Sequence, residues 1–452
     1  MSMKNIYLIG IGGIGMSAIA RYYHRKGYSV AGYDRTPSEL TRKLEAEGID
    51  VHYEDLPQRI PGTPEETLVV YTPAVPDDLG EMVRAREGGF RLVKRSRMLG
   101  EIAEGQCCLA VAGTHGKTTT STLLAHLFTQ AGGGCTAFLG GISKNYDSNL
   151  LVSAQPVIVA EADEFDRSFL QLHPDIAVIT AMDADHLDIY GDLAHVHEAF
   201  RAFASQVKGT VIAKLGLPLH PQDTSARILH YSYEDPAADF HAACPRCDEK
   251  GCYHYDLVYP GGVLKDVRIG APGRINAENS VAALAVALCH GLDAEALREA
   301  AGTFQGVRRR MDVRYQKGGV TYIDDYAHHP QELSATIKAL REMFPGKRLT
   351  AVFQPHLYTR TRDFAEAFAE ALSAVDRLLM LDIYPAREAP IPGVSSRMIL
   401  EQVTAPRKEL VAKDKLVDIL REETPEVLVT FGAGDIDRLT GPIAEMLREK
   451  LG

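Results

Sequence analysis

The stretch that decides the fold of this chain is Cys108-Leu109-Ala110-Val111-Ala112-Gly113-Thr114-His115-Gly116-Lys117-Thr118-Thr119. Its apolar start, 108–112, predicts a buried strand, and the amphipathic residues 119–130 predict a helix. A strand that passes through a short glycine turn into a helix is typical of α/β folds with parallel sheets. The stretch therefore predicts an α/β domain with a mostly parallel sheet.

The turn in this stretch has the composition of a phosphate-binding loop. Its backbone amides can surround phosphate oxygens, Lys117 can reach the β- and γ-phosphates, and Thr118 can ligate Mg²⁺. The loop departs from the pattern G-x-x-x-x-G-K-[ST], because Val111 stands where the first glycine would be. We interpret it as an ATP site formed by Gly113, Thr114, His115, Gly116, Lys117, Thr118 and Thr119.

A second glycine turn lies near the N-terminus, between an apolar run at 6–9 and a helical pattern at 16–26. The spacing G-x-G-x-x-G, which lets a backbone approach a diphosphate at a helix start, is formed by Gly10, Gly12, Gly13 and Gly15. Asp34 follows the next predicted strand, 30–33, where a ribose-binding acid belongs. A dinucleotide cofactor and a UDP-sugar both fit this pattern. A tight turn without a ligand is the structural alternative.

Acidic residues and a histidine follow two further predicted strands, at 157–160 and 176–179. Glu161 ends the first strand and His186 follows the second. Carboxylates at the carboxyl end of a strand, beside a phosphate loop, suit a Mg²⁺ ion. Together with Thr118 they predict a metal site, although each residue taken alone also fits a solvated loop charge or a helix cap.

A third series of predicted strands starts at 320–323 and continues at 349–353, 378–381 and 427–431. Asp325 and His328 follow its first strand, and Arg360 follows its second. Cationic and histidine side chains on one sheet edge can bind a carboxylate or a phosphate. The strands at 6–9, 108–112 and 320–323 each begin a new series of strands and helices. The chain is therefore divided into three predicted α/β domains, 1–105, 106–314 and 315–452.

Composition restricts the class of protein. The 452 residues carry a net charge of −11, which argues against a nucleic-acid-binding surface. No signal peptide and no apolar run of about 20 residues is present, so we expect a cytoplasmic protein that binds no membrane. We also expect a monomer or a weak homodimer.

The chain has seven cysteines, an odd number that does not indicate a disulfide framework. Cys244, Cys247 and Cys252 have a spacing that resembles a zinc site, with His241 or His254 nearby. Only one C-x-x-C pair is present. Free thiols in a hairpin are therefore the favoured interpretation, and structural zinc is the alternative.

Taken together, these motifs make the chain resemble the Mur ligases of peptidoglycan synthesis nearly from end to end. The segments that carry the resemblance, in chain order, are 10–17, 112–120, 161–166, 185–188, 276–279, 304–310, 324–330 and 354–363. The resemblance implies a Rossmann-like N-terminal domain that binds a UDP-sugar, a central P-loop ATPase domain and a Rossmann-like C-terminal domain that brings the amino acid.

The resemblance also implies a reaction, in which ATP drives the joining of L-alanine to the carboxylate of UDP-N-acetylmuramate. Phosphoryl transfer would form an acyl phosphate, and attack by the amine would release phosphate. An alternative within the family is a recycling ligase that attaches a whole tripeptide to the same UDP-sugar. Outside the family, an NAD-dependent oxidoreductase explains only the first glycine turn, and a non-enzymatic nucleotide-binding scaffold explains only the second.

By this resemblance, residue roles can be assigned. The implied catalytic residues are Lys117, Glu161, His186, His328 and Arg360, and the implied ligands of Mg²⁺ are Thr118, Glu161 and His186. Asn276 and Asn279 would contact adenine, while Arg309 and Asp325 would approach the nucleotide from a domain joint. The implied UDP-sugar contacts are Gly10, Gly12, Gly13, Gly15, Ser17 and Asp34.

Overall fold

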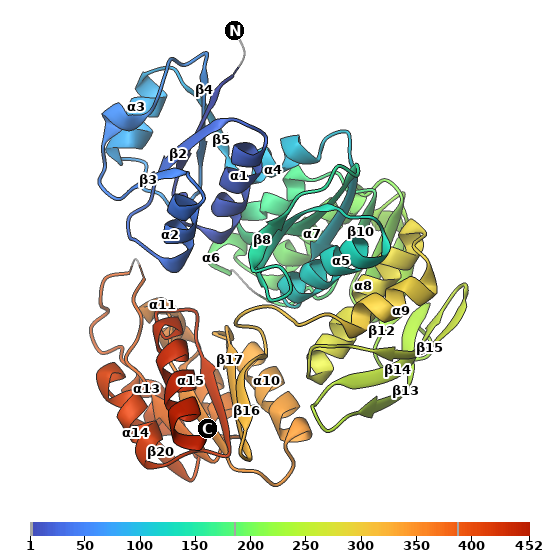
Figure 1. Cartoon of the computed structure of the whole chain (residues 1–452), viewed down its shortest axis with the longest axis vertical. Coiled ribbons are helices and arrows are strands. Elements are labelled where there is room, and N and C mark those ends of the chain that lie inside the picture. The colour runs from blue at the N-terminus through green and yellow to red at the C-terminus, as the bar shows by residue number, and fades with distance from the viewer. Residues whose placement is uncertain (1–2, 185–186, 387) are drawn as a thin grey trace. The chain divides into compact units, whose positions relative to one another are not determined.

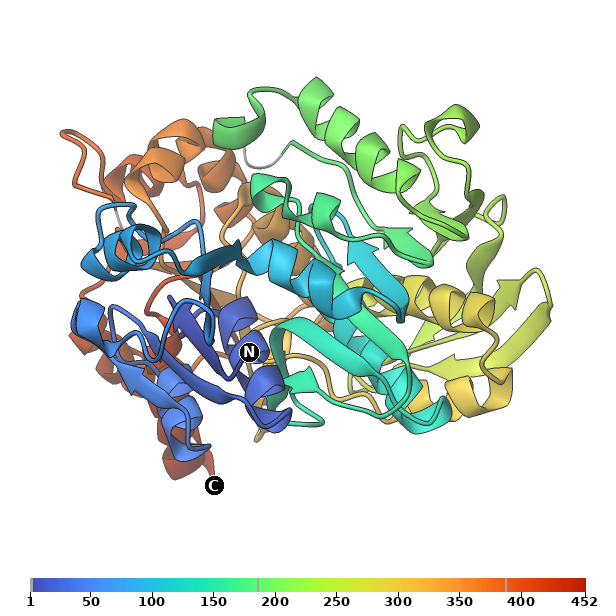
Figure 2. The same ribbon diagram turned by 90° about the horizontal axis from the view of Figure 1, so that it is seen from above.

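The computed structural model describes residues 3–184, 187–386 and 388–452, which form two compact units (Figures 1 and 2). The first unit comprises Met1–Pro245, Tyr255–Ile269 and Glu278–Gln305. The second comprises Arg246–His254, Gly270–Ala277 and Gly306–Gly452. None of the helices in the described ranges combines the length and apolar composition that a bilayer crossing requires.

The N-terminal sheet is fully parallel. In spatial order its strands are β3 (Asp50–His52), β2 (Ser29–Tyr33), β1 (Asn5–Ile9), β4 (Thr67–Tyr71) and β5 (Arg91–Lys94). Its helices are α1 (Ile14–Arg25), α2 (Glu39–Ala46), α3 (Gly80–Glu87) and α4 (Arg95–Ala103). The strands predicted at 6–9 and 30–33 and the helix predicted at 16–26 are confirmed, with ends that differ by one or two residues.

The central sheet has ten strands, and its middle is parallel. In spatial order they are β15 (Gly262–Arg268), β14 (Tyr253–Tyr259), β13 (Phe240–Cys247), β12 (Arg227–Ser232), β11 (Thr210–Lys214), β10 (Ile176–Ile179), β6 (Cys107–Ala112), β9 (Val157–Ala162), β7 (Thr136–Ser143) and β8 (Ser148–Leu151). Its helices are α5 (Lys117–Ala131), α6 (Leu187–Tyr190), α7 (Leu193–Ser205), α8 (Arg274–His290) and α9 (Ala294–Gly302). The strand and helix predicted on either side of the phosphate loop are confirmed as β6 and α5.

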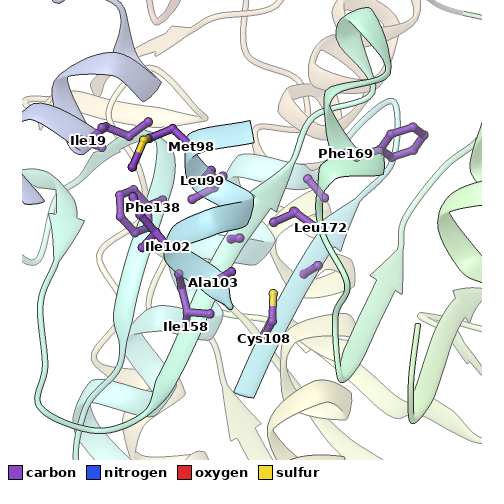
Figure 3. Packing of buried hydrophobic residues seen from close by; sticks show 14 of the residues in the cluster. Ile19, Met98, Leu99, Ile102, Ala103, Cys108, Phe138, Ile158, Phe169 and Leu172 are labelled. Carbon is purple, nitrogen blue, oxygen red and sulfur yellow. The ribbon is translucent and has the colours of Figure 1, made fainter. Parts of the chain in front are cut away.

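One hydrophobic cluster joins the N-terminal and central sheets. Figure 3 shows Ile19 of α1 beside Met98 of α4, and the same cluster includes Ile102 of α4 and Phe138 of β7 in the central sheet. Fully burying an aliphatic or aromatic side chain of this size contributes about 1.5–3 kcal/mol. A continuous core of this kind explains why the two sheets belong to one compact unit.

The C-terminal sheet is parallel except at one edge, where β16 pairs antiparallel with β17. In spatial order its strands are β16 (Asp312–Lys317), β17 (Val320–Asp325), β21 (Val427–Phe431), β18 (Leu349–Phe353), β19 (Arg377–Met380) and β20 (Arg407–Leu410). Its helices are α10 (Pro330–Met343), α11 (Tyr358–Asp363), α12 (Ala365–Leu372), α13 (Arg397–Gln402), α14 (Leu416–Glu422) and α15 (Asp437–Leu451). The four predicted strands are confirmed, whereas the two edge strands, β16 and β20, were not predicted, because they are short and mostly polar and lack the apolar runs of the inner strands.

The cysteine-rich segment forms β13 and β14 of the central sheet. Cys244 and Cys247 are exposed, whereas Cys252 is buried and its thiol contacts the carbonyl oxygen of Gly270 at 3.4 Å. Within the described ranges, no group of three or more His, Cys, Asp or Glu side chains is arranged to hold a metal ion. The zinc alternative therefore finds no support in the geometry of this segment.

Candidate active site

The phosphate loop requires its glycines at two positions. Gly113 and Gly116 have φ values of +137° and +83°, a region that favours glycine. A Cβ on Gly113 would collide with Thr180 Oγ1, and a Cβ on Gly116 would lie 2.7 Å from Asn279 Oδ1. The loop is therefore packed closely against the end of β10 and against α8.

Hydrogen bonds fix this loop to the chain that follows β10. The backbone N–H of Thr114 donates to Ala181 O at 3.2 Å, and the Thr114 hydroxyl accepts from the N–H of Asp183 at 3.1 Å. His115 Nε2 lies 3.7 Å from an Asp183 carboxylate oxygen. Thr119 is buried in the first turn of α5. The predicted loop residues thus form one rigid turn at the carboxyl ends of β6 and β10.

Lys117 has a side chain only 14% exposed and is fully engaged by protein groups. Its ammonium donates to Gly113 O at 2.7 Å and to the two carboxylate oxygens of Glu164 at 2.8 and 2.7 Å. Burial alone would lower the pKa of Lys117, but the nearby carboxylates, led by Glu164, hold that pKa above its ordinary value. Lys117 is therefore a charged group at the centre of the loop.

Glu161 and Thr118 supply oxygen atoms beside Lys117. The Thr118 hydroxyl donates to Glu161 Oε1 at 3.0 Å, and the Ser121 hydroxyl donates to Glu161 Oε2 at 3.3 Å. The backbone N–H of Gly140 donates to the same oxygen at 3.0 Å. Carboxylate and hydroxyl oxygens are the ligands that Mg²⁺ prefers, so this pair fits the ion. His186, the third predicted ligand, lies outside the described residues.

The N-terminal glycine turn is closed by the predicted acid. Asp34 Oδ2 accepts a hydrogen bond from the backbone N–H of Gly12 at 2.8 Å. A Cβ on Gly12 would lie 2.7 Å from the same oxygen, and Gly10, with φ +86°, needs the conformational freedom of glycine. The structure therefore brings the loop and Asp34 together, with the carboxylate on the loop backbone.

Two side chains beside this turn, Ser17 and Arg95, contact different parts of the unit. Ser17 is fully buried, donates to Ile14 O at 2.9 Å and accepts from Asn149 Nδ2 at 3.0 Å. Its hydroxyl therefore connects α1 to β8. Arg95 was not predicted, yet a Cβ on Gly15 would lie 2.9 Å from its Nη1. Arg95 Nη2 also lies 3.6 Å from Asp163 Oδ2, so this cation borders both the glycine turn and the segment after Glu161.

The two predicted adenine contacts lie one turn apart in α8, and both are buried. Asn279 borders the phosphate loop at Gly116. The Asn276 amide donates to Pro272 O at 2.6 Å, which fixes the start of the helix.

In the second unit, Asp325 and Arg309 are held by protein groups. The Asp325 carboxylate accepts from the backbone N–H of Met311 at 2.7 Å and of Ala327 at 2.9 Å. Burial raises the pKa of Asp325 to about 6, against the effect of these hydrogen bonds. Arg309 donates to Gly432 O and lies 3.3 Å from a carboxylate oxygen of the buried Asp324. Both residues therefore shape the end of β17.

His328 and Arg360 lie close together at the carboxyl ends of β17 and β18. Burial lowers the pKa of the His328 imidazole, and the nearby Arg360 guanidinium lowers it further, while Glu332 acts in the opposite direction. His328 Nδ1 lies 3.0 Å from Tyr326 O, and its ring lies 6.0 Å from that of His356. The site in this unit thus combines an imidazole whose pKa is lowered with a guanidinium cation.

Sequence reasoning missed two residues of the first unit. Glu164 lies in the predicted acidic segment, but no local pattern distinguishes it from Asp163 or Asp166. Arg95 starts α4 directly after β5, and a cation at a strand-to-helix junction is the signal that could have found it.

The chain belongs to the Mur ligase family. Three family models match it in succession: "Mur ligase family, catalytic domain" at residues 5–106, "Mur ligase middle domain" at 111–287 and "Mur ligase, glutamate ligase domain" at 309–434. The chain is thus a ligase with the three-domain, mostly parallel α/β fold of this family, as predicted. Family membership also excludes the oxidoreductase alternative.

The chain is also similar to individual members of the family. The chain is 49% identical to UDP-N-acetylmuramate–L-alanine ligase of Porphyromonas gingivalis over 99% of both chains. It is 48% identical to the ligase of the same name from Christiangramia forsetii, over 96% of this chain and 95% of the other. The crystal structure of UDP-N-acetylmuramate-alanine ligase from Thermotoga maritima matches with a TM-score of 0.83 and 26% identity, over 99% of this chain and 100% of the other.

A murein peptide ligase from Psychrobacter arcticus shares the fold. Its TM-score is 0.70 over 98% of both chains, at 19% identity.

Proposed function

We propose that the chain joins L-alanine to the carboxylate of UDP-N-acetylmuramate at the expense of ATP, forming UDP-N-acetylmuramoyl-L-alanine, ADP and phosphate. The observation that carries this proposal is 49% identity over 99% of both chains to a ligase named for this substrate pair, combined with a phosphate loop that holds Lys117. The reaction is an early step of peptidoglycan synthesis, so the enzyme would act in the cytoplasm and support cell shape and division.

The chemistry requires activation because a carboxylate is a poor electrophile. Transfer of the γ-phosphoryl group to a carboxylate oxygen forms an acyl phosphate and ADP. Attack by the neutral amine of L-alanine then forms the amide bond and expels phosphate. The carboxylate and the γ-phosphate repel one another, so cations must surround the point where they meet.

We assign the cations and polar groups of this step to both units. Lys117 would bind the phosphates, and Thr118, Glu161 and His186 would hold Mg²⁺, which supplies charge neutralisation when bound. Asn276 and Asn279 would contact adenine, with Arg309 and Asp325 on the nucleotide side. His328 and Arg360 would face the alanine and the acyl phosphate, and the turn of Gly10, Gly12, Gly13, Gly15, Ser17 and Asp34 would bind the UDP-sugar.

The same proposal gives each domain a role. Residues 1–105 would bind the UDP-sugar, 106–314 would bind ATP, and 315–452 would bring the amino acid. The enzyme would act as a monomer or a weak homodimer. Binding groups on separate domains imply closure around the substrates, which would protect the acyl phosphate from water.

Phosphate release tests the proposal. Purified protein is incubated with Mg-ATP and UDP-N-acetylmuramate, with and without L-alanine, and the product is weighed by mass spectrometry. Release that needs all three substrates, with a product heavier by one alanine residue, is the expected result. Release with the tripeptide but not with alanine would instead assign the recycling reaction.

A further inference from the structure

The side chain that engages Lys117 is an acid with no role in the proposed reaction. The Glu164 side chain is 1% exposed, and both of its oxygens accept hydrogen bonds from the Lys117 ammonium. With Gly113 O as the third acceptor, the three N–H donors of that ammonium all have protein partners. A phosphate that binds Lys117 must therefore replace one of these partners.

The segment that carries Glu164 is held in place on several sides. The Tyr190 hydroxyl donates to Glu164 O at 2.6 Å, and the backbone N–H of Arg167 donates to the same oxygen at 2.9 Å. Asp163 lies 3.6 Å from Arg95, and Asp166 lies 3.3 Å from Lys94. The carboxylate is thus presented to Lys117 by a fixed backbone, so its position does not depend on a flexible loop.

Charge around Lys117 makes the replacement unfavourable for a phosphate that arrives without a cation. Glu161, Asp163 and Glu164 all act on Lys117 electrostatically. Like charges a few ångströms apart repel one another strongly in a partly buried site, so a phosphate that displaces Glu164 is repelled by these carboxylates. A divalent cation that accompanies the phosphate offsets this repulsion.

We propose that Glu164 is a positioning residue: it holds Lys117 in the loop before nucleotide binds, must release it to the incoming phosphate, and thereby selects nucleotides that carry Mg²⁺. The inference rests on the proposed ATP site and adds a selection step to it. Glu164 itself would not touch the nucleotide.

The test measures ADP binding by titration calorimetry, once with Mg²⁺ and once with a chelator. The quantity compared is the dissociation constant with the chelator divided by that with Mg²⁺. In Glu164→Gln we expect this ratio to fall by about tenfold or more, because a repelling charge worth at least 1.4 kcal/mol is removed. Glu164→Asp keeps the charge but shortens the side chain, so its ratio should fall by about threefold. If Glu164→Gln does not fold, Glu164→Asp alone decides the question.

The matched control is Asp166→Asn, which removes one charge from the same segment at a residue paired with Lys94. Its ratio should equal that of the unaltered enzyme, and an equal fall there would overturn the proposal. An unchanged ratio in the Glu164 variants, with tight Mg-ADP binding preserved, would also overturn it and would leave the proposed function intact. Failure of the unaltered enzyme and every variant to bind ADP in either medium would refute both.

Discussion

Both glycine turns of the chain follow a strand of a parallel sheet and lead into a helix, from β1 to α1 and from β6 to α5. They differ in how acid and cation are placed. In the first turn, Asp34 accepts a hydrogen bond from the loop backbone at Gly12. In the second, Glu164 engages a lysine that belongs to the helix start itself. The first turn thus offers mainly backbone N–H groups, whereas the second adds the charged ammonium of Lys117.

Two buried carboxyl groups, Glu164 and Glu81, also differ in whether a cation lies beside them. Glu164 has a cation as its partner, whereas Glu81, at 0% exposure, faces the Tyr7 hydroxyl at 2.8 Å and lies 3.5 Å from His52. Burial raises the pKa of Glu81 to about 7, while burial lowers the pKa of His52. Burial raises the pKa of Glu164 as well, but there the Lys117 ammonium, which donates directly to the carboxylate, acts in the opposite direction.

The largest effect should follow from Lys117→Ala. We expect turnover to fall by about a thousandfold or more, since a preorganised cation at a transferring phosphoryl group contributes several kcal/mol. Binding of UDP-N-acetylmuramate, measured by calorimetry, should be nearly unchanged, because the first turn does not use this residue. Loss of both properties would contradict the separation of the two turns.

A double variant separates folding from catalysis in that experiment. Lys117→Ala leaves Glu164 buried without its cation, which is expected to destabilise the fold by about 3–5 kcal/mol. Lys117→Ala combined with Glu164→Gln should recover most of that stability, as measured by denaturant unfolding, while turnover stays lost. Recovery of turnover in the double variant would show that Lys117 is only structural.

The next largest effect is expected on the pH dependence of the free energy of unfolding, through Glu81. The folded-state pKa of Glu81 lies above its ordinary value of 4.5, so the folded protein binds more protons than the unfolded chain between pH 4.5 and about pH 7. Stability contributed by this group is therefore greatest at low pH and falls by about 3 kcal/mol as pH rises through that range.

Glu81→Gln removes this titration and supplies a neutral amide of similar shape. The variant should equal the unaltered protein in unfolding free energy at pH 4 and exceed it at pH 8. His52 is present in both proteins, so the difference between their pH profiles reports Glu81. Parallel profiles would show that Glu81 is ionised in the folded state, as Glu164 can be.

The smallest effect concerns the first turn itself. Gly12→Ala places a methyl group against Asp34 Oδ2 and Thr41 Cγ2, both 2.7 Å away, and should cost about 1–3 kcal/mol of stability. Gly13→Ala meets nothing closer than 3.5 Å and has ordinary backbone geometry, so its unfolding free energy should hardly change. Equal losses in denaturant unfolding would mean that the Asp34 contact does not constrain the turn.

Much of this molecule follows from local pattern. The strands beside both glycine turns, the helices α1 and α5, and the placement of Glu161 and Asp34 at strand ends were predicted and are confirmed, because apolar periodicity and glycine are local signals. The edge strand β16 was missed because it is short and mostly polar, and its place in the sheet is set by antiparallel pairing with β17.

The sequence by itself determined the fold class, the order of the motifs and the chemical character of the phosphate loop, because these depend on residues that are neighbours along the chain. Only the tertiary structure decided which acid engages Lys117, since Glu164 lies 47 positions away and resembles the other acids around it. It likewise decided that Asp34 meets its own loop, that Ser17 is occupied by Asn149 and that Arg95 borders Gly15. Such pairings depend on how separate strands converge at one sheet edge, which no local pattern encodes.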